Sequence, residues 1–294
     1  MSVFSGRHGI VVGVDGSPAS KVAVDWAARE ADMRNAPLTL VHVLPAARFW
    51  PEVATPSRIE QLYQSQAQRW LREATTVAEK AMTAPGRIDT RLLDGAVLPS
   101  LVDLSKEAQL IVVGCRGQGS LARRLMGSIS RGLVQRAHCP VAVVHDEDPL
   151  MSCPVEQAPV VVGIDGSPAS ELAAEIAFDE ASRRGVELVA VHAWMDDTTF
   201  ELPADEWTAT GKGMAEQTLT QQLARWHERY PEVPVRQVVV RDQPARQLVK
   251  QADDAQLVVV GSHGRGGFAG MLLGSVAAAV AESARMPVIV ARSS

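Results

Sequence analysis

The sequence predicts an α/β protein made of two tandem domains, each with a five-strand parallel sheet and helices on both faces of the sheet. Three observations support this prediction. The chain has 294 residues, which suits about two domains, since a single core seldom grows past roughly 250–300 residues. Its second half repeats the first, and each half alternates apolar runs of strand length with segments of helical apolar spacing.

The repeat is visible without any gap. Residues 11–45 align with residues 161–195, and 17 of the 35 aligned positions are identical at an offset of 150. Further along, residues 109–119 align with residues 256–266 at an offset of 147. A period this long indicates two whole domains, because solenoid repeats have periods of roughly 20–50 residues.

The domain boundaries follow from the repeat. We expect a first domain over residues 1–145 and a second over residues 159–294. The segment between them, 146–158, is acidic and contains two prolines, which is typical of a linker.

The order of elements is clearest in the first half. Apolar or alternating runs predict strands, and apolar residues at helical spacing predict the helices between them. The expected strands are 9–14, 37–43, 87–95, 108–114 and 139–145, and the expected helices are 18–34, 57–82, 99–106 and 127–138. Strands that are apolar on both faces and separated by helices imply a parallel sheet covered on both sides. Right-handed crossovers then give a doubly wound (Rossmann-like) fold, in which ligands bind beyond the carboxyl ends of the strands.

Composition excludes several classes of protein. An apolar content of 46% argues against a disordered chain, and a net charge of -5 disfavours a dedicated partner of DNA or RNA. The three cysteines, Cys115, Cys139 and Cys153, lack the C-x2-C spacing of metal clusters and are too few for a disulfide framework. The residues before the first strand lack the apolar stretch of a signal peptide, and no apolar run reaches the ~18 residues of a membrane span. We therefore expect a cytoplasmic protein.

A turn of sequence DGSPAS follows the first strand of each half. Gly16 permits a tight turn, and Ser17 with Pro18 is typical of a helix N-cap followed by proline at the first helical position. For Ser17 we favour this capping role. Asp15 and Asp165 end their strands on a carboxylate, which either holds the turn or accepts hydrogen bonds from a ribose or a base.

A glycine-rich loop follows the fourth strand of each half, with the pattern G-x2-G-x9-G-S starting at Gly114 and at Gly261. Glycines let backbone N–H groups approach an anion, and a helix that opens at Gly127-Ser128 offers further N–H groups and its dipole to a phosphate. The hydroxyl of Ser128 could cap the helix, bind a phosphate oxygen, or do both. Two copies with identical spacing favour a ligand site over a plain connection.

Some polar side chains near these loops have two interpretations. Arg116 and His263 occupy matching positions between the first two glycines, where each could reach a phosphate or point to solvent. His42 and His192 end their second strands and are interpreted as satisfied structural histidines. Cys115 could be a redox-sensitive thiol, but its counterpart is a serine, which favours a small polar filler.

The duplicated Asp turn and glycine loop resemble those of the universal stress protein family, in its ATP-binding branch and its two-domain mycobacterial type. The resemblance covers about residues 9–145 and 159–292. It implies one ATP in each half, with Mg2+ accompanying the phosphates and adenine near the backbone of Val41 and Val191. It also implies a regulatory role in the stress response, a homodimer and a downstream protein partner.

The residues that we assign to nucleotide binding combine the motifs with this resemblance. No catalytic residue and no metal-ligating side chain is assigned. The first site comprises Gly13, Asp15, Val41, Gly114, Arg116, Gly117, Gln118, Gly119, Ser120, Gly127 and Ser128. The second comprises Gly163, Asp165, Val191, Gly261, His263, Gly264, Arg265, Gly266, Gly267, Gly274, Ser275 and Val276.

An ATP-consuming enzyme, either a slow ATPase or a phosphotransferase, is the alternative function. The sequence favours a regulatory nucleotide-binding protein, because the P-loop string G-x4-G-K-[ST] is absent and no general base is apparent. Residues 117–122 fit the dinucleotide pattern G-x-G-x-x-A, but they follow the fourth strand instead of the first. No serine nucleophile elbow and no H-E-x-x-H helix occurs.

Overall fold

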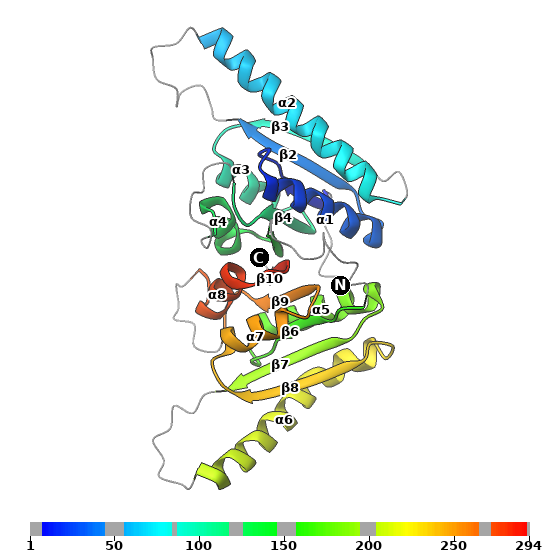
Figure 1. Ribbon diagram of the computed structural model, residues 1–294, viewed down its shortest axis with the longest axis vertical. Helices are drawn as coiled ribbons and strands as arrows, with labels where there is room; N and C mark the ends of the chain where they lie inside the picture. The colour runs from blue at the N-terminus through cyan, green and yellow to red at the C-terminus, as the bar shows by residue number, and fades with distance from the viewer. Residues whose placement is uncertain are drawn as a thin grey trace. The chain divides into compact units, whose positions relative to one another are not determined.

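The computed structural model describes residues 8–44, 56–83, 87–117, 126–145, 157–194, 204–264 and 272–292. The chain divides into two compact units, Met1–Glu147 (unit 1) and Asp148–Arg292 (unit 2), and most of their elements are labelled in Figure 1. The predicted linker, 146–158, lies outside the described residues apart from its last two positions.

Unit 1 contains one parallel five-strand sheet. Its strands are β1 (Ile10–Gly13), β2 (Leu38–Leu44), β3 (Ile88–Asp94), β4 (Leu110–Gly114) and β5 (Val141–Val144). They lie in the order β3-β2-β1-β4-β5, and every neighbouring pair is parallel. This confirms the five-strand parallel sheet that the alternation of elements predicts.

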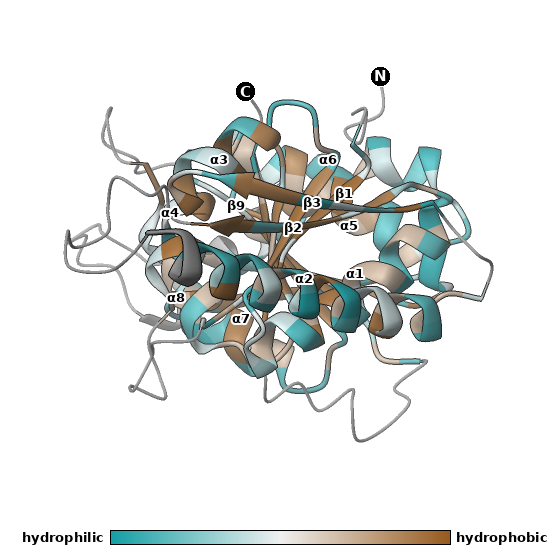
Figure 2. Ribbon diagram, turned by 90° about the horizontal axis from the view of Figure 1, so that it is seen from above, coloured by the Kyte–Doolittle hydropathy of each residue, from teal (hydrophilic) through white to brown (hydrophobic). Residues whose placement is uncertain are grey.

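Four helices cover the sheet of unit 1. They are α1 (Pro18–Arg34), α2 (Pro56–Ala81), α3 (Val97–Leu104) and α4 (Ser128–Arg136). Helices α1 and α2 contact each other on one face, and α3 and α4 contact each other on the other face. Figure 2 shows β2 and β3 between α3 on one side and α1 and α2 on the other. The fold is therefore doubly wound, as expected.

Unit 2 repeats this architecture. Its strands are β6 (Val160–Gly163), β7 (Leu188–Trp194), β8 (Val235–Arg241), β9 (Leu257–Gly261) and β10 (Val288–Ala291), and they follow the order β10-β9-β6-β7-β8. All neighbouring pairs within the unit are parallel. Its helices are α5 (Pro168–Arg184), α6 (Ala204–Arg229), α7 (Pro244–Ala252) and α8 (Ser275–Ser283). Each element of unit 1 thus has a counterpart at the same place in the fold.

The core of each unit lies along its central strands. Every residue of β2 and all but the last residue of β1 and of β4 are buried, whereas all seven residues of β3 are partly or fully exposed. Burial on both faces explains why the central strands are continuous apolar runs of Val, Ile and Leu. In Figure 2 these strands are mainly brown, while the helices also carry hydrophilic residues.

Local sequence explains where the first helix of each unit begins. Ser17 is the N-cap of α1, and its hydroxyl oxygen accepts a hydrogen bond from the backbone N–H of Ser20 at 3.1 Å. Pro18 is the first helical residue, where its missing N–H costs nothing. Ser167 caps α5 in the same way. The predicted capping role of Ser17 is confirmed.

The winding of each sheet fixes where a ligand could enter. In unit 1 the chain leaves β1 toward β2 on one face and reaches β4 from the other, so the switch point lies at the carboxyl ends of β1 and β4. Both motifs of the sequence follow these two strands.

In the described part of the chain, no helix has the length and apolar character needed to span a bilayer.

Candidate functional site

The Asp turn after β1 is held by its own carboxylate. Oδ1 of Asp15 accepts a hydrogen bond from the backbone N–H of Ser17 at 2.9 Å, and Gly16 has a φ of 78°. Asp165 and Ser167 make the same bond at 2.9 Å in unit 2. One carboxylate oxygen of each Asp therefore fixes the turn, and the other oxygen, Oδ2, lies on the side of the glycine loop.

The glycine loop approaches this second oxygen closely. An ideal Cβ placed on Gly117 would lie 2.6 Å from Oδ2 of Asp15, and one on Gly264 would lie 2.6 Å from Oδ2 of Asp165. Real Cβ contacts are not that short, so only glycine lets the loop backbone pass the carboxylate. Two motifs about a hundred residues apart in sequence thus meet in one place within each unit.

The first glycine of each loop has a packing role. A Cβ on Gly114 would lie 2.8 Å from the backbone carbonyl carbon of Ala19, and one on Gly261 would lie 2.7 Å from that of Ala169. The end of β4 therefore packs directly on the first turn of α1, and the end of β9 packs on α5. These glycines also line the pockets described below, so each of them both packs against a helix and forms part of a pocket wall.

The last glycine of each loop begins a helix. Gly127 is the N-cap of α4 and Gly274 is the N-cap of α8, and neither helix start receives a side-chain hydrogen bond. Ser128 is the first helical residue of α4, and the cap position belongs to Gly127 before it, so helix capping, one of the roles that the sequence left open for the Ser128 hydroxyl, is not seen in the structure. The N–H groups of the first turn are consequently not occupied by a side-chain cap, which is the arrangement that favours an anion.

A pocket opens at this place in each unit. It has a volume of about 180 Å³ in unit 1 and about 280 Å³ in unit 2. One end of the unit 1 pocket is apolar and is formed by β2 and α3, through Val41, Val43, Val97 and Leu101. The other end is formed by the Asp turn, the glycine loop and the start of α4. Each pocket therefore combines an apolar slot with a polar end rich in backbone.

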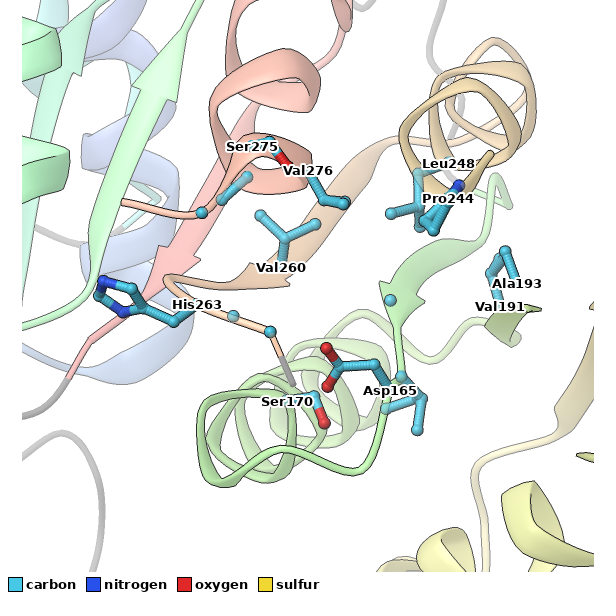
Figure 3. Close-up of a pocket in the computed structure, with 16 residues that line it drawn as sticks. Asp165, Ser170, Val191, Ala193, Pro244, Leu248, Val260, His263, Ser275 and Val276 are labelled. Atoms are coloured by element: carbon cyan, nitrogen blue, oxygen red, sulfur yellow. The ribbon is translucent and has the colours of Figure 1, made fainter. Parts of the chain in front are cut away.

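Figure 3 shows the pocket of unit 2. Val191 and Ala193 from β7 lie on the same side as Pro244 and Leu248 from α7, and Ser275 and Val276 at the start of α8 lie on the other side. The carboxylate of Asp165 lies near Ser170, below both groups in this view. This is the same division into an apolar and a polar end as in unit 1.

Arg116 and His263, the matching residues between the first two glycines of each loop, both take part in the pockets. Both residues line their pocket, and both are partly buried. In Figure 3 the imidazole of His263 points away from Asp165 and from the rest of the lining. Its Nδ1 lies 3.0 Å from the hydroxyl oxygen of Ser262, and its backbone oxygen accepts a hydrogen bond from Ser167 at 3.2 Å. His263 thus lines the pocket on its backbone side.

The histidines at the ends of β2 and β7 are structural, as the sequence predicts. Nδ1 of His42 donates to the carbonyl oxygen of Val14 at 2.6 Å, and Nδ1 of His192 donates to that of Ile164 at 2.7 Å. Because a carbonyl oxygen only accepts, this bond places the proton on Nδ1.

Comparisons with known proteins agree with this architecture. The model of the universal stress protein family matches residues 6–145 and again residues 158–292. The chain belongs to the universal stress protein family. A universal stress protein of Mycobacterium tuberculosis is 54% identical over 297 residues, covering 100% of this chain and 99% of its own. A second one from the same organism is 51% identical over 291 residues, covering 98% of each chain.

The fold is also that of the universal stress proteins. The crystal structure of a universal stress protein from Archaeoglobus fulgidus covers 97% of this chain and 98% of its own, with a TM-score of 0.69 and 20% sequence identity. The predicted family and the predicted fold class, two tandem domains of one α/β architecture, are therefore both confirmed.

The structure gathers most of the residues that the sequence assigns to each universal stress protein domain. Gly13 and Gly163 line the pockets at the ends of β1 and β6, and Val41 and Val191 line them from β2 and β7. Six assigned residues lie outside the described residues: Gln118, Gly119, Ser120, Arg265, Gly266 and Gly267.

Sequence reasoning missed one wall of each pocket and one neighbouring tryptophan. The wall comes from α3 and α7, which reach the site only because the crossover after the third strand returns over the sheet. Trp70 of α2 lies edge-on to His42, with ring centroids 5.3 Å apart, and its indole lies against Gly16. The sequence does place Trp70 on the apolar stripe of a predicted helix, which indicates that its side chain is buried. Nothing in the sequence, however, places that helix beside the Asp turn.

Proposed function

We propose that each universal stress protein domain of this chain binds one ATP, and that the protein is a regulator whose nucleotide-loaded state is its output. The observation that carries the proposal is the duplicated pocket at the switch point of each sheet. There an Asp turn, a glycine loop and a helix start without a side-chain cap face an apolar slot. Ligands of doubly wound sheets bind at this point.

The two ends of each pocket suit the two ends of a nucleotide. An adenine ring would occupy the apolar slot formed in unit 1 by Val41, Val43 and Leu101. The phosphates would lie toward the glycine loop and the start of α4, where backbone N–H groups and the helix dipole favour negative charge. Asp15 stands between these ends, beside Gly117, and would accept hydrogen bonds from the ribose.

We propose that Mg2+ enters with the nucleotide. Among the described residues, no group of three or more His, Cys, Asp or Glu side chains could hold a metal ion. Mg2+ commonly keeps several waters and binds through substrate phosphates with one or two carboxylates. The phosphates together with water molecules would therefore supply most of its ligands here.

The test is calorimetry with ATP and Mg2+ on protein stripped of nucleotide. The wild type should bind two ATP molecules per chain. Gly117→Ala and Gly264→Ala should each retain one, because the added methyl group displaces the Asp carboxylate beside it. Gly213→Ala is the matched control, since a Cβ there meets nothing within 4 Å. The proposal fails if the stripped wild type takes up no ATP.

The same preparations separate a regulator from an enzyme. Asp15 already holds the N–H of Ser17, and His42 is bonded to Val14, so the lining carboxylate and imidazole of unit 1 serve the fold. We therefore expect phosphate release well below the ~1–1000 per second that is typical of enzymes. Release at an enzymatic rate that Asp15→Ala together with Asp165→Ala abolishes would favour the ATPase or phosphotransferase instead.

The remaining parts of the proposal rest on the family. We propose a cytoplasmic protein that acts in the stress response as a homodimer and through a downstream protein partner. Light scattering on the eluting protein, with and without ATP, tests the dimer: a mass near 63 kDa supports it, being twice the 31.5 kDa of one chain. A mass of one chain under both conditions contradicts it.

A further inference from the structure

The two pockets have the same backbone frame but different widths. Their volumes are about 180 Å³ in unit 1 and about 280 Å³ in unit 2. Apart from Arg116 and His263 in the glycine loops, three matching positions of the lining carry a side chain with fewer atoms in unit 2. The pairs are Val43 and Ala193, Ile129 and Val276, and Ser130 and Ala277.

These three positions do not act on the same end of the pocket. Ile129 and Ser130 belong to the first turn of α4, at the polar end, where the hydroxyl of Ser130 donates to the carbonyl oxygen of Gly114 at 2.7 Å. At the end of β1 the larger side chain belongs to unit 2, where Ile164 occupies the position that Val14 has in unit 1. The extra room of unit 2 is therefore not spread evenly over the lining.

Val43 and Ala193 lie at the apolar end. Val43 follows Val41 by two residues on β2, so both side chains stand on the same face of the sheet, which is the face covered by α3. Val43 is 6% exposed, so its two methyl groups fill space inside the slot. In unit 2 the corresponding Ala193 lies with Val191 on the same side of the pocket as Pro244 and Leu248 (Figure 3), and its single methyl group leaves that space open.

The apolar slot is the end that the proposed function gives to the base of the nucleotide. A gain or loss of one methylene in an apolar pocket changes affinity by roughly 10- to 200-fold, and Val43 and Ala193 differ by more than that. A base with an added alkyl group would collide with the methyl groups of Val43 in unit 1. In unit 2 the same group would fill the space beside Ala193.

We propose that the two sites differ in the size of the base they accept: the site in unit 2 takes purine nucleotides with an alkyl-substituted base that unit 1 excludes. The pair Val43 and Ala193 determines this difference. This inference rests on the proposed function, since it gives the ligand class of the same two pockets.

The experiment measures how many molecules of each nucleotide one chain binds, by calorimetry or equilibrium dialysis. The ligands are ATP and three analogues with a propyl group at N6, C2 or C8 of adenine. The proteins are the full-length wild type and the reciprocal variants Val43→Ala and Ala193→Val. Each protein is first titrated with unmodified ATP, and the affinity of every analogue at a site is compared with that of ATP at the same site of the same protein.

For at least one analogue, we expect one molecule bound per wild-type chain, two per chain of Val43→Ala, and none per chain of Ala193→Val. A loss of affinity of at least 10-fold at a site counts as exclusion. If ATP binds at both sites but neither substitution changes the stoichiometry of any analogue, the inference is overturned while the proposed function stands. If unmodified ATP does not bind the wild type, the proposed function itself fails.

Discussion

Asp15 and Asp165 illustrate how the two oxygens of one carboxylate can have different places in a fold. One oxygen of each carboxylate accepts the N–H two residues ahead and closes the turn. The other oxygen lies so close to the glycine loop that a methyl group would not fit between them. The sequence left two roles open for these residues; the geometry shows the first of them, and the second belongs to the proposed function.

A buried thiol gives a prediction at the residue scale that does not involve nucleotide. Cys139 is 5% exposed, and burial raises the pKa of its thiol to about 12 from 9.0. Between these two pH values the unfolded chain loses the thiol proton and the folded chain keeps it. The free energy of unfolding must therefore fall as pH rises above about 9.

The measurement is urea unfolding at pH 8 and at pH 10 for the wild type and Cys139→Ala. The wild type should lose about 1.4 kcal/mol more than the variant over this interval, which is the linkage energy of one pH unit. The other alkaline groups titrate in both proteins and cancel in the comparison. Equal losses would show that the Cys139 thiol ionises in the folded state.

At the scale of the element, α1 and α5 both end at a residue with left-handed backbone conformation, but the residue type differs between the two helices. Asn35 follows α1 with a φ of 48°, and Gly185 follows α5 with a φ of 64°. Both residues are in the left-handed region, where glycine has no penalty and asparagine only a small one. The internal repeat therefore preserves the backbone shape of the cap and not its residue.

This equivalence predicts the ranking of two substitutions. Gly185→Ala should lower the free energy of unfolding by about 1 kcal/mol, because alanine is strained at positive φ. A Cβ at position 185 meets nothing within 4 Å, so the loss is a backbone effect. Gly185→Asn should cost clearly less, because unit 1 tolerates asparagine there. Urea unfolding of the two variants measures the difference, and an equal cost for both would contradict the argument.

At the scale of the whole molecule, each unit has what an independent domain requires. Unit 1 and unit 2 each have a complete parallel sheet of five strands, two pairs of helices and a core of fully buried apolar residues. A domain of about 150 residues buries roughly 68–70% of the surface of its unfolded chain, which is enough for a stable core.

We therefore expect residues 1–147 and residues 148–294, expressed separately, to fold without each other. Each half should show a cooperative thermal transition and the circular dichroism of an α/β protein, and each should bind one ATP. A mixture of the two halves provides the control. Halves that unfold without cooperativity alone, but gain a sharp transition when mixed, would show that neither core is sufficient.

The sequence by itself determined much of this architecture, because strands, helices and helix caps depend on neighbouring residues or on the periodic spacing of apolar residues. Apolar runs of strand length such as 108–114, helical spacing such as that of 18–34, and the serine cap before Pro18 each depend on neighbouring residues. Because of the internal repeat, each of these patterns occurs twice in the chain. Those signals predicted the fold class, the element order and the two loops that form the pocket.

Only the tertiary structure decided what lies opposite those loops. The contact of Gly117 with Asp15 joins segments about a hundred residues apart, and the apolar wall from α3 depends on how a crossover returns over the sheet. The direction of the His263 side chain, the place of Trp70 beside Gly16 and the cap position of Gly127 likewise depend on packing. Local sequence patterns do not contain this information, because the direction of a side chain and the width of a pocket depend on neighbours that only folding brings together.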